Sequence, residues 1–125
     1  MKQFNWKYCV AGLSAAFVAG VLFVDEIRAQ QAQYSIKQIM TKAHKGNNSF
    51  ANRAKSGKAS AREIQYLLSL YRSMVYLKPP RGNVSAFRQK SVALIRATEG
   101  LLRNPRSTAA YSRAVDCNGC HNSHK

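Results

Sequence analysis

Acidic residues are scarce in this sequence, with 5 Asp and Glu against 20 Lys and Arg among 125 residues and a formal net charge of +15. Proline and glycine are also few, at 3 and 7, which excludes collagen-like and low-complexity chains. The hydrophobic fraction of 46% excludes a wholly disordered protein. The length permits one small domain and excludes a barrel or a doubly wound sheet. The excess of base indicates an acidic partner or surface, without saying which kind.

The first 29 residues have the pattern of an export signal. Lys2 and Lys7 precede a long uncharged stretch, and Ala29 supplies a small residue at the cleavage point. We therefore predict a signal peptide over residues 1–29, a mature domain over residues 30–125 and a periplasmic or otherwise exported protein. The alternative is an uncleaved membrane anchor, and we expect contact with a membrane only in that case.

Cleavage would leave 17 Lys and Arg against 3 Asp and Glu, a net charge of +14, and two of the three cysteines. An exported protein meets little nucleic acid. We therefore expect the basic surface to bind acidic protein partners and not nucleic acid.

Four segments after the signal have the apolar periodicity of helices, and none shows the alternation typical of a strand. The second segment starts with a capping box, in which Ser60 and Glu63 satisfy each other's free backbone N–H groups. We expect residues 47–59, rich in Asn, Ser, Gly and Lys, to form a loop. The sequence predicts an all-α fold, and its short connections favour an antiparallel four-helix bundle. The predicted helices are residues 36–43, a helix from Ser60 that ends before the Pro79-Pro80-Arg81-Gly82 turn, residues 84–102, and a helix that opens at Asn104-Pro105.

The most specific motif is the C-x-x-C-H sequence at residues 117–121, which is typical of covalent haem attachment. On a helix Cys117 and Cys120 share a face, so both sulfurs can bond to the vinyl-derived carbons of one porphyrin. His121, four residues after Cys117, then points its imidazole at the iron as the proximal ligand. The sequence thus predicts one covalent haem c on the C-terminal helix.

Three other interpretations of these residues stay open. Cys117, Cys120, His121 and His124 could bind zinc, although four ligands so close together would strain a tetrahedral site. A Cys-x-x-Cys dithiol is a second alternative, but such redox pairs normally lie at a helix N-terminus, and this pair is expected at the end of the last helix. A plain structural disulfide is the third, and it would leave His121 without a role.

With these residues the chain resembles the cytochrome c prime family and its low-spin relatives, which are small four-helix proteins with a single C-x-x-C-H near the C-terminus. It is similar in particular to short exported monohaem cytochromes of planctomycete-type bacteria, through residues 40–46, 78–82 and 117–125. The sequence departs from cytochrome c prime after the haem histidine, where His124 and Lys125 replace an aromatic residue and an arginine. The resemblance implies a haem protein that transfers electrons or binds a gas, and it leaves a homodimer open.

The sixth ligand of the iron separates these two roles. The resemblance implies Met40 as the distal ligand, and His44, one turn later, is the alternative. Six-coordinate iron would make the protein an electron carrier that docks acidic redox partners through its basic surface. Five-coordinate iron, with Met40 only lining an apolar distal pocket, would make it a protein that binds a small gas such as NO or CO. A zinc- or polyanion-binding module without haem is the third hypothesis.

Catalysis is not expected from this sequence. No arrangement of Ser, His, Asp or Cys typical of a catalytic centre is found, and no phosphate-binding glycine loop. Beyond the predicted signal peptide, the carboxylate side chains are Glu63, Glu99 and Asp116. The capping box occupies the first of these, and the last adjoins the predicted haem site.

Overall fold

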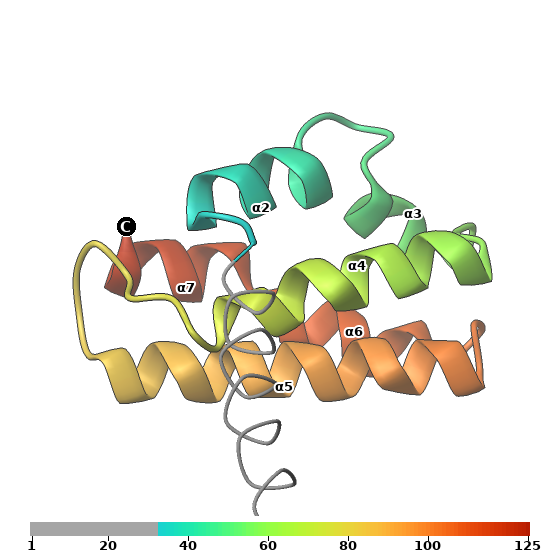
Figure 1. Ribbon diagram of the computed structural model, residues 1–125. Helices are drawn as coiled ribbons and strands as arrows, with labels where there is room; N and C mark the ends of the chain where they lie inside the picture. The colour runs from blue at the N-terminus through green and yellow to red at the C-terminus, as the bar shows by residue number, and fades with distance from the viewer. Residues whose placement is uncertain (1–32) are drawn as a thin grey trace, which may run out of the picture. The chain divides into compact units, whose positions relative to one another are not determined.

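The structure, a computed structural model, describes residues 33–125, which belong to one compact unit spanning Gln31–Lys125. The predicted signal peptide over residues 1–29, with its anchor alternative, lies outside the described residues. The described part consists of helices and contains no strand, so the prediction of an all-α fold is confirmed (Figure 1). Within residues 33–125 no helix is both long enough and apolar enough to cross a membrane.

Six helices make up the described part of the chain, and local capping sets where most of them begin. The predicted capping box is confirmed, because the Ser60 N–H donates to Glu63 Oε2 at 2.7 Å and the Glu63 N–H donates to Ser60 Oγ at 3.3 Å. A second capping box joins Ser35 and Gln38 at the start of the first described helix. The helices are α2 (Ile36–His44), α3 (Phe50–Lys55), α4 (Ala61–Met74), α5 (Val84–Arg103), α6 (Thr108–Ala114) and α7 (Cys117–His124).

Helix α3 lies inside the stretch predicted to be a loop. The Ser49 side chain caps it by accepting a hydrogen bond from the Asn52 N–H at 3.3 Å. Ala51 and Ala54 are buried, and Phe50 packs edge-on against Tyr66 of α4 with ring centroids 5.4 Å apart. The prediction was wrong because the buried residues are two alanines in a polar stretch, which gives a weak apolar periodicity.

The predicted fourth helix is two helices, α6 and α7, separated at Val115 and Asp116. Residues 104–107 form a turn instead of the first helical turn, so α6 begins at Thr108. Asp116 starts a new helix because its carboxylate accepts a hydrogen bond from the Gly119 N–H at 2.9 Å. The part of the chain that the structure describes therefore has six helices where the sequence predicted four.

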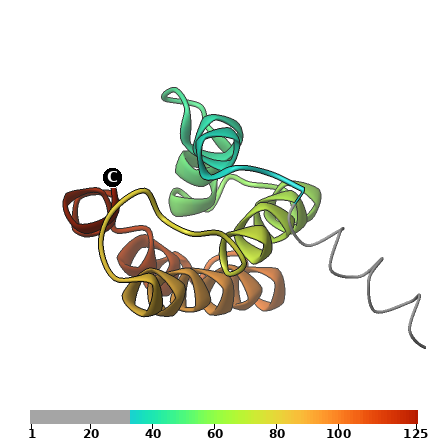
Figure 2. The ribbon, with the colours of Figure 1, turned by 60° about the vertical axis from the view of Figure 1, so that its left-hand side comes forward.

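Helices α4 and α5 form a long antiparallel pair, and α6 and α7 return along α5 (Figure 1). Helices α2 and α3 pack against α4. Figure 2 shows α2 above the α4–α5 pair and α7 to the left of it. The apolar faces predicted for α4 and α5 are buried, which includes Ile64, Leu67, Phe87 and Leu94. Tyr71 and Tyr111 are the largest fully buried side chains of the described core.

The loop between α4 and α5 holds the end of α7 in place. Gly82 has φ +84° and passes so close to α7 that a Cβ at this position would collide with the Ser123 carbonyl oxygen and lie 2.8 Å from His124 Nδ1. The Arg81 guanidinium donates to the Asn122 carbonyl at 3.4 Å. On its other side the buried His124 ring meets Phe87 of α5 edge-on, with centroids 5.5 Å apart. Helix α7 is thus fixed between a glycine turn and α5.

Candidate functional site

A cavity of about 610 Å³ lies where the ends of α2 and α4 meet α5, α6 and α7. Its lining includes all five residues that the sequence analysis selected, namely Met40, His44, Cys117, Cys120 and His121. The first two come from α2 and the other three from α7, far apart in the sequence. The rest of the wall is largely apolar and includes Met74, Leu94, Ala114 and Val115. Such a volume lies within the range of about 300–1,000 Å³ found for small-molecule and cofactor sites.

The turn before α7 sets the directions of the two cysteines. Asp116 caps α7, and Gly119 lets the cap close, because a Cβ at this position would collide with the Asp116 carboxylate. Cys117 is the first residue of α7 and is exposed, whereas Cys120, one turn later, is half-buried. Both are free thiols.

This placement corrects the reasoning used against a dithiol. The sequence analysis expected the cysteines at the end of a helix, but the structure places Cys117 at the N-terminus of α7. The pKa of Cys120 bears on the same dithiol alternative. Burial raises the pKa of the Cys120 thiol, the negative charge of Asp116 raises it further, and Lys90 opposes these effects only in part. The thiol that attacks in such a pair is the one at the helix N-terminus, here Cys117, so a raised pKa at Cys120 does not exclude a dithiol.

The zinc alternative has no supporting geometry in the described part of the chain. His121 is exposed and lines the cavity, but His124 is buried at 5% exposure between the glycine turn and Phe87. Neither ring nitrogen of His124 has a hydrogen-bond partner. Among residues 33–125 no group of three or more His, Cys, Asp and Glu side chains is placed to hold a metal ion.

The two candidate distal ligands have different surroundings. Met40 is half-buried in the second turn of α2 and lines the cavity, and its sulfur has no hydrogen-bond partner among residues 33–125. His44 is the last residue of α2, and its Nε2 lies 3.2 Å from the Tyr71 hydroxyl oxygen. The two rings lie 5.8 Å apart at 34°. Burial lowers the pKa of His44, and electrostatic interactions with Lys55 and His121 lower it further, which favours a neutral His44 hydrogen-bonded to Tyr71.

The hydrogen bonds of Tyr71 are a feature that the sequence analysis missed. Its hydroxyl also lies 2.8 Å from the hydroxyl of Tyr111, which connects α4 to α6 beneath the cavity. Burial raises the pKa of both phenols, to about 12 for Tyr111, so both are protonated at neutral pH. Tyr71 lies on the same helical face as Ile64 and Leu67, so its burial follows from the helical periodicity. A buried hydroxyl needs a partner, but spacing in the sequence does not identify a partner on another helix.

Comparison of the chain with protein-family models, with curated proteins and with solved structures finds no match. The function is therefore inferred from the residues of the cavity and their geometry.

Proposed function

We propose that this protein is an exported monohaem c-type cytochrome that carries electrons between redox partners. The observation that carries the proposal is the convergence of Cys117, Cys120, His121 and Met40 on one apolar cavity. Two thiols and an imidazole come from α7 and a thioether comes from α2, so the donors belong to two helices far apart in the sequence. This donor set would allow covalent attachment of a haem through two sulfurs and ligation of its iron by His121 and Met40.

The residues present fit a haem by their chemistry. Cys117 and Cys120 would each add an S–H across one vinyl group, forming a C–S bond while the proton goes to the other vinyl carbon, and this step needs no oxidant. His121 would supply the proximal nitrogen. Met74, Leu94 and Val115 would exclude water from the faces of the macrocycle. When bound, the iron of the haem supplies the one-electron chemistry, and the protein sets its ligands and its surroundings.

Met40 is the stronger of the two distal candidates. The Nε2 of His44 is engaged by Tyr71 at 3.2 Å, whereas the Met40 sulfur has no competing hydrogen bond. A thioether ligand raises the reduction potential of haem iron, which suits an electron carrier. His44 then remains a hydrogen-bonded residue at the edge of the cavity.

The remaining parts of the proposal concern the fold and the partners. We propose that α6 and α7 together take the place of the haem-bearing last helix of a four-helix bundle, with α2, α4 and α5 as the others.

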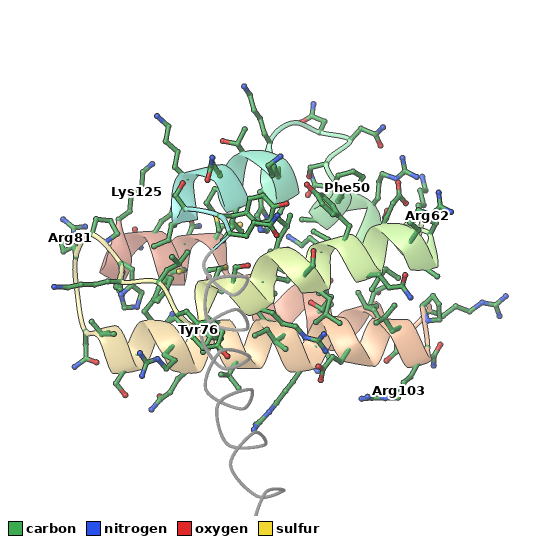
Figure 3. All side chains as sticks on the ribbon, in the orientation of Figure 1. Phe50, Arg62, Tyr76, Arg81, Arg103 and Lys125 are labelled. Atoms are coloured by element: carbon green, nitrogen blue, oxygen red, sulfur yellow. The ribbon has the colours of Figure 1, made fainter. Side chains whose placement is uncertain are left out.

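The chain carries +15 overall, and cationic side chains project from both ends of the described unit, with Arg62 and Arg103 at one end and Arg81 and Lys125 at the other (Figure 3). This charge supports weak, fast and salt-sensitive docking to acidic redox proteins.

The test is an absorption spectrum of the full chain matured with the haem-attachment machinery, recorded oxidised, reduced and with carbon monoxide. We expect a haem that resists extraction by acidified organic solvent, a low-spin spectrum in both states, and slow or absent uptake of carbon monoxide. A chain that acquires no haem would refute the proposal. A high-spin reduced form that binds carbon monoxide readily would support the gas-binding alternative instead.

A matched pair of variants identifies the distal ligand. Met40→Ala should convert the low-spin spectrum to a high-spin one, because the iron loses its sixth ligand. His44→Ala is the control, since it lies one turn away on the same cavity wall, and it should leave the spectrum low-spin. The reverse result would assign His44 as the ligand.

A further inference from the structure

Three basic side chains line the otherwise apolar cavity. Lys45 follows the end of α2, Lys90 lies in the second turn of α5, and Arg113 lies in the last turn of α6. They reach the cavity from three separate elements. All three are exposed, so each can place its charge at the cavity rim while its aliphatic stem stays on the wall.

These cations have no anionic partner among residues 33–125. The two ion pairs of the described part join Arg53 to Glu63 at 3.0 Å and Arg72 to Glu99 at 2.9 Å, both away from the cavity. The one carboxylate on the cavity lining is Asp116, and it is held by the Gly119 N–H as the cap of α7. Three positive charges therefore meet a single carboxylate that is already hydrogen-bonded.

The excess of positive charge at the rim and the apolar wall indicate what kind of ligand the cavity suits. Like charges at the rim of one cavity repel one another, and an anionic ligand relieves this repulsion. The apolar wall suits a large hydrophobic body. The cavity therefore suits a ligand with an apolar body and acidic groups at its edge, in preference to a neutral ligand of the same shape.

We propose that Lys45, Lys90 and Arg113 bind the two carboxylates of a porphyrin and so select a dicarboxylic porphyrin for this cavity. The inference rests on the proposed function, because it concerns the same cavity and the same ligand. Arg113 contributes most, since its planar guanidinium binds a carboxylate through two parallel hydrogen bonds, whereas a lysine acts as a point charge. Before the thioether bonds form, these contacts orient the macrocycle relative to Cys117 and Cys120.

The experiment compares two porphyrins that differ only at their two acid groups, which are free in one and methyl esters in the other. The full chain carrying Cys117→Ser and Cys120→Ser, which prevents covalent attachment, is titrated with metal-free protoporphyrin and with its dimethyl ester, and binding is followed by porphyrin fluorescence. We expect the dicarboxylate to bind roughly tenfold more tightly than the diester, equivalent to about 1.4 kcal/mol. The further substitutions Lys45→Gln, Lys90→Gln and Arg113→Gln together should abolish this preference, and Arg113→Gln alone should remove the largest share of it.

The control removes the same number of charges elsewhere. Lys42→Gln, Lys58→Gln and Arg106→Gln alter two lysines and one arginine that do not line the cavity, and the preference for the dicarboxylate should persist. Equal affinity of the parent chain for both porphyrins would overturn the inference and leave the proposed function standing. Equal losses in the cavity and control variants would also overturn it, because the preference would then come from net charge. Failure to bind either porphyrin would overturn the inference alone, because the proposed function rests on thioether bonds and iron ligands that this titration removes.

Discussion

The hydroxyl oxygens of Tyr71 and Tyr111 lie 2.8 Å apart, and both side chains are fully buried. Tyr71 also contacts His44 Nε2 at 3.2 Å. Tyr111 has no other hydrogen-bond partner among the described residues, so one arrangement satisfies both hydroxyl protons. Tyr111 donates to Tyr71, and Tyr71 donates to a neutral His44 that carries its proton on Nδ1. A directional chain of hydrogen bonds therefore runs from the core to the cavity.

Tyr71→Phe should lower the free energy of unfolding more than Tyr111→Phe does. Tyr71→Phe leaves both the Tyr111 hydroxyl and His44 Nε2 without their partner, and we expect a loss of about 1–3 kcal/mol in the free energy of unfolding. Tyr111→Phe leaves the Tyr71–His44 hydrogen bond intact, so its loss should be smaller. Urea unfolding followed by circular dichroism gives both values. Equal losses would show that Tyr71 does not bridge the two groups.

The lowered pKa of His44 makes stability depend on pH. The unfolded chain takes up a proton near the ordinary value of 6.5, whereas the folded chain takes it up at a lower pH. The unfolded state therefore binds more protons in this interval, and stability falls as the pH drops below about 6.5. We expect unfolding free energies measured between neutral and mildly acidic pH to decline less steeply in His44→Gln. An identical decline in both proteins would contradict a role for His44.

The glycine turn against α7 can be tested with two glycines that share a left-handed conformation. Gly46 has φ +89° and open space around it, so Gly46→Ala carries only the conformational cost of about 1–2 kcal/mol. Gly82→Ala adds a collision with the Ser123 carbonyl, and we expect a further loss of about 1–3 kcal/mol. Hydrogen exchange of the α7 amides should accelerate in Gly82→Ala alone. Equal effects of the two substitutions would mean that the turn does not hold α7.

The charges around Cys120 predict how its thiol reacts. In a chain carrying Cys9→Ser and Cys117→Ser, the pH dependence of alkylation by iodoacetamide reports the pKa of Cys120. Asp116→Asn keeps an oxygen for the cap but removes the charge that raises this pKa, so the pKa should fall. Lys90→Gln removes the charge that lowers it, so the pKa should rise. Lys42→Gln is the distant control. A pKa that does not respond to Asp116→Asn would contradict the electrostatic account.

Local signals in the sequence predicted much of this fold. The capping box at Ser60 and the apolar faces of α4 and α5 were correct, because capping and helical periodicity depend on neighbours three or four residues away. The break before α7 was missed. Asp116 and Gly119 do have the spacing of a helix cap, and this signal could have located the break.

The candidate site was also predictable only in part. Cys117, Cys120 and His121 could be selected from spacing alone, Met40 from a resemblance, and His44 from its position one turn after Met40. The contacts that distinguish Met40 from His44 were not predictable, since they depend on Tyr71 and Tyr111, which lie on two other helices. The three cavity cations also look like ordinary surface residues in the sequence. Only the packing of α2, α5 and α6 brings them to one rim.

The residues of α2 and α7 that line the cavity are synthesised at different times. Met40 and His44 are made well before Cys117, and at about 5–20 residues per second the delay between the two walls is roughly 4–15 seconds. During this interval the part of the wall formed by α7 is absent, so apolar lining residues such as Met74 and Leu94 border an incomplete cavity. A ligand cannot be enclosed while the chain is elongating. Loading of the cavity therefore cannot begin until the last part of its wall has been made.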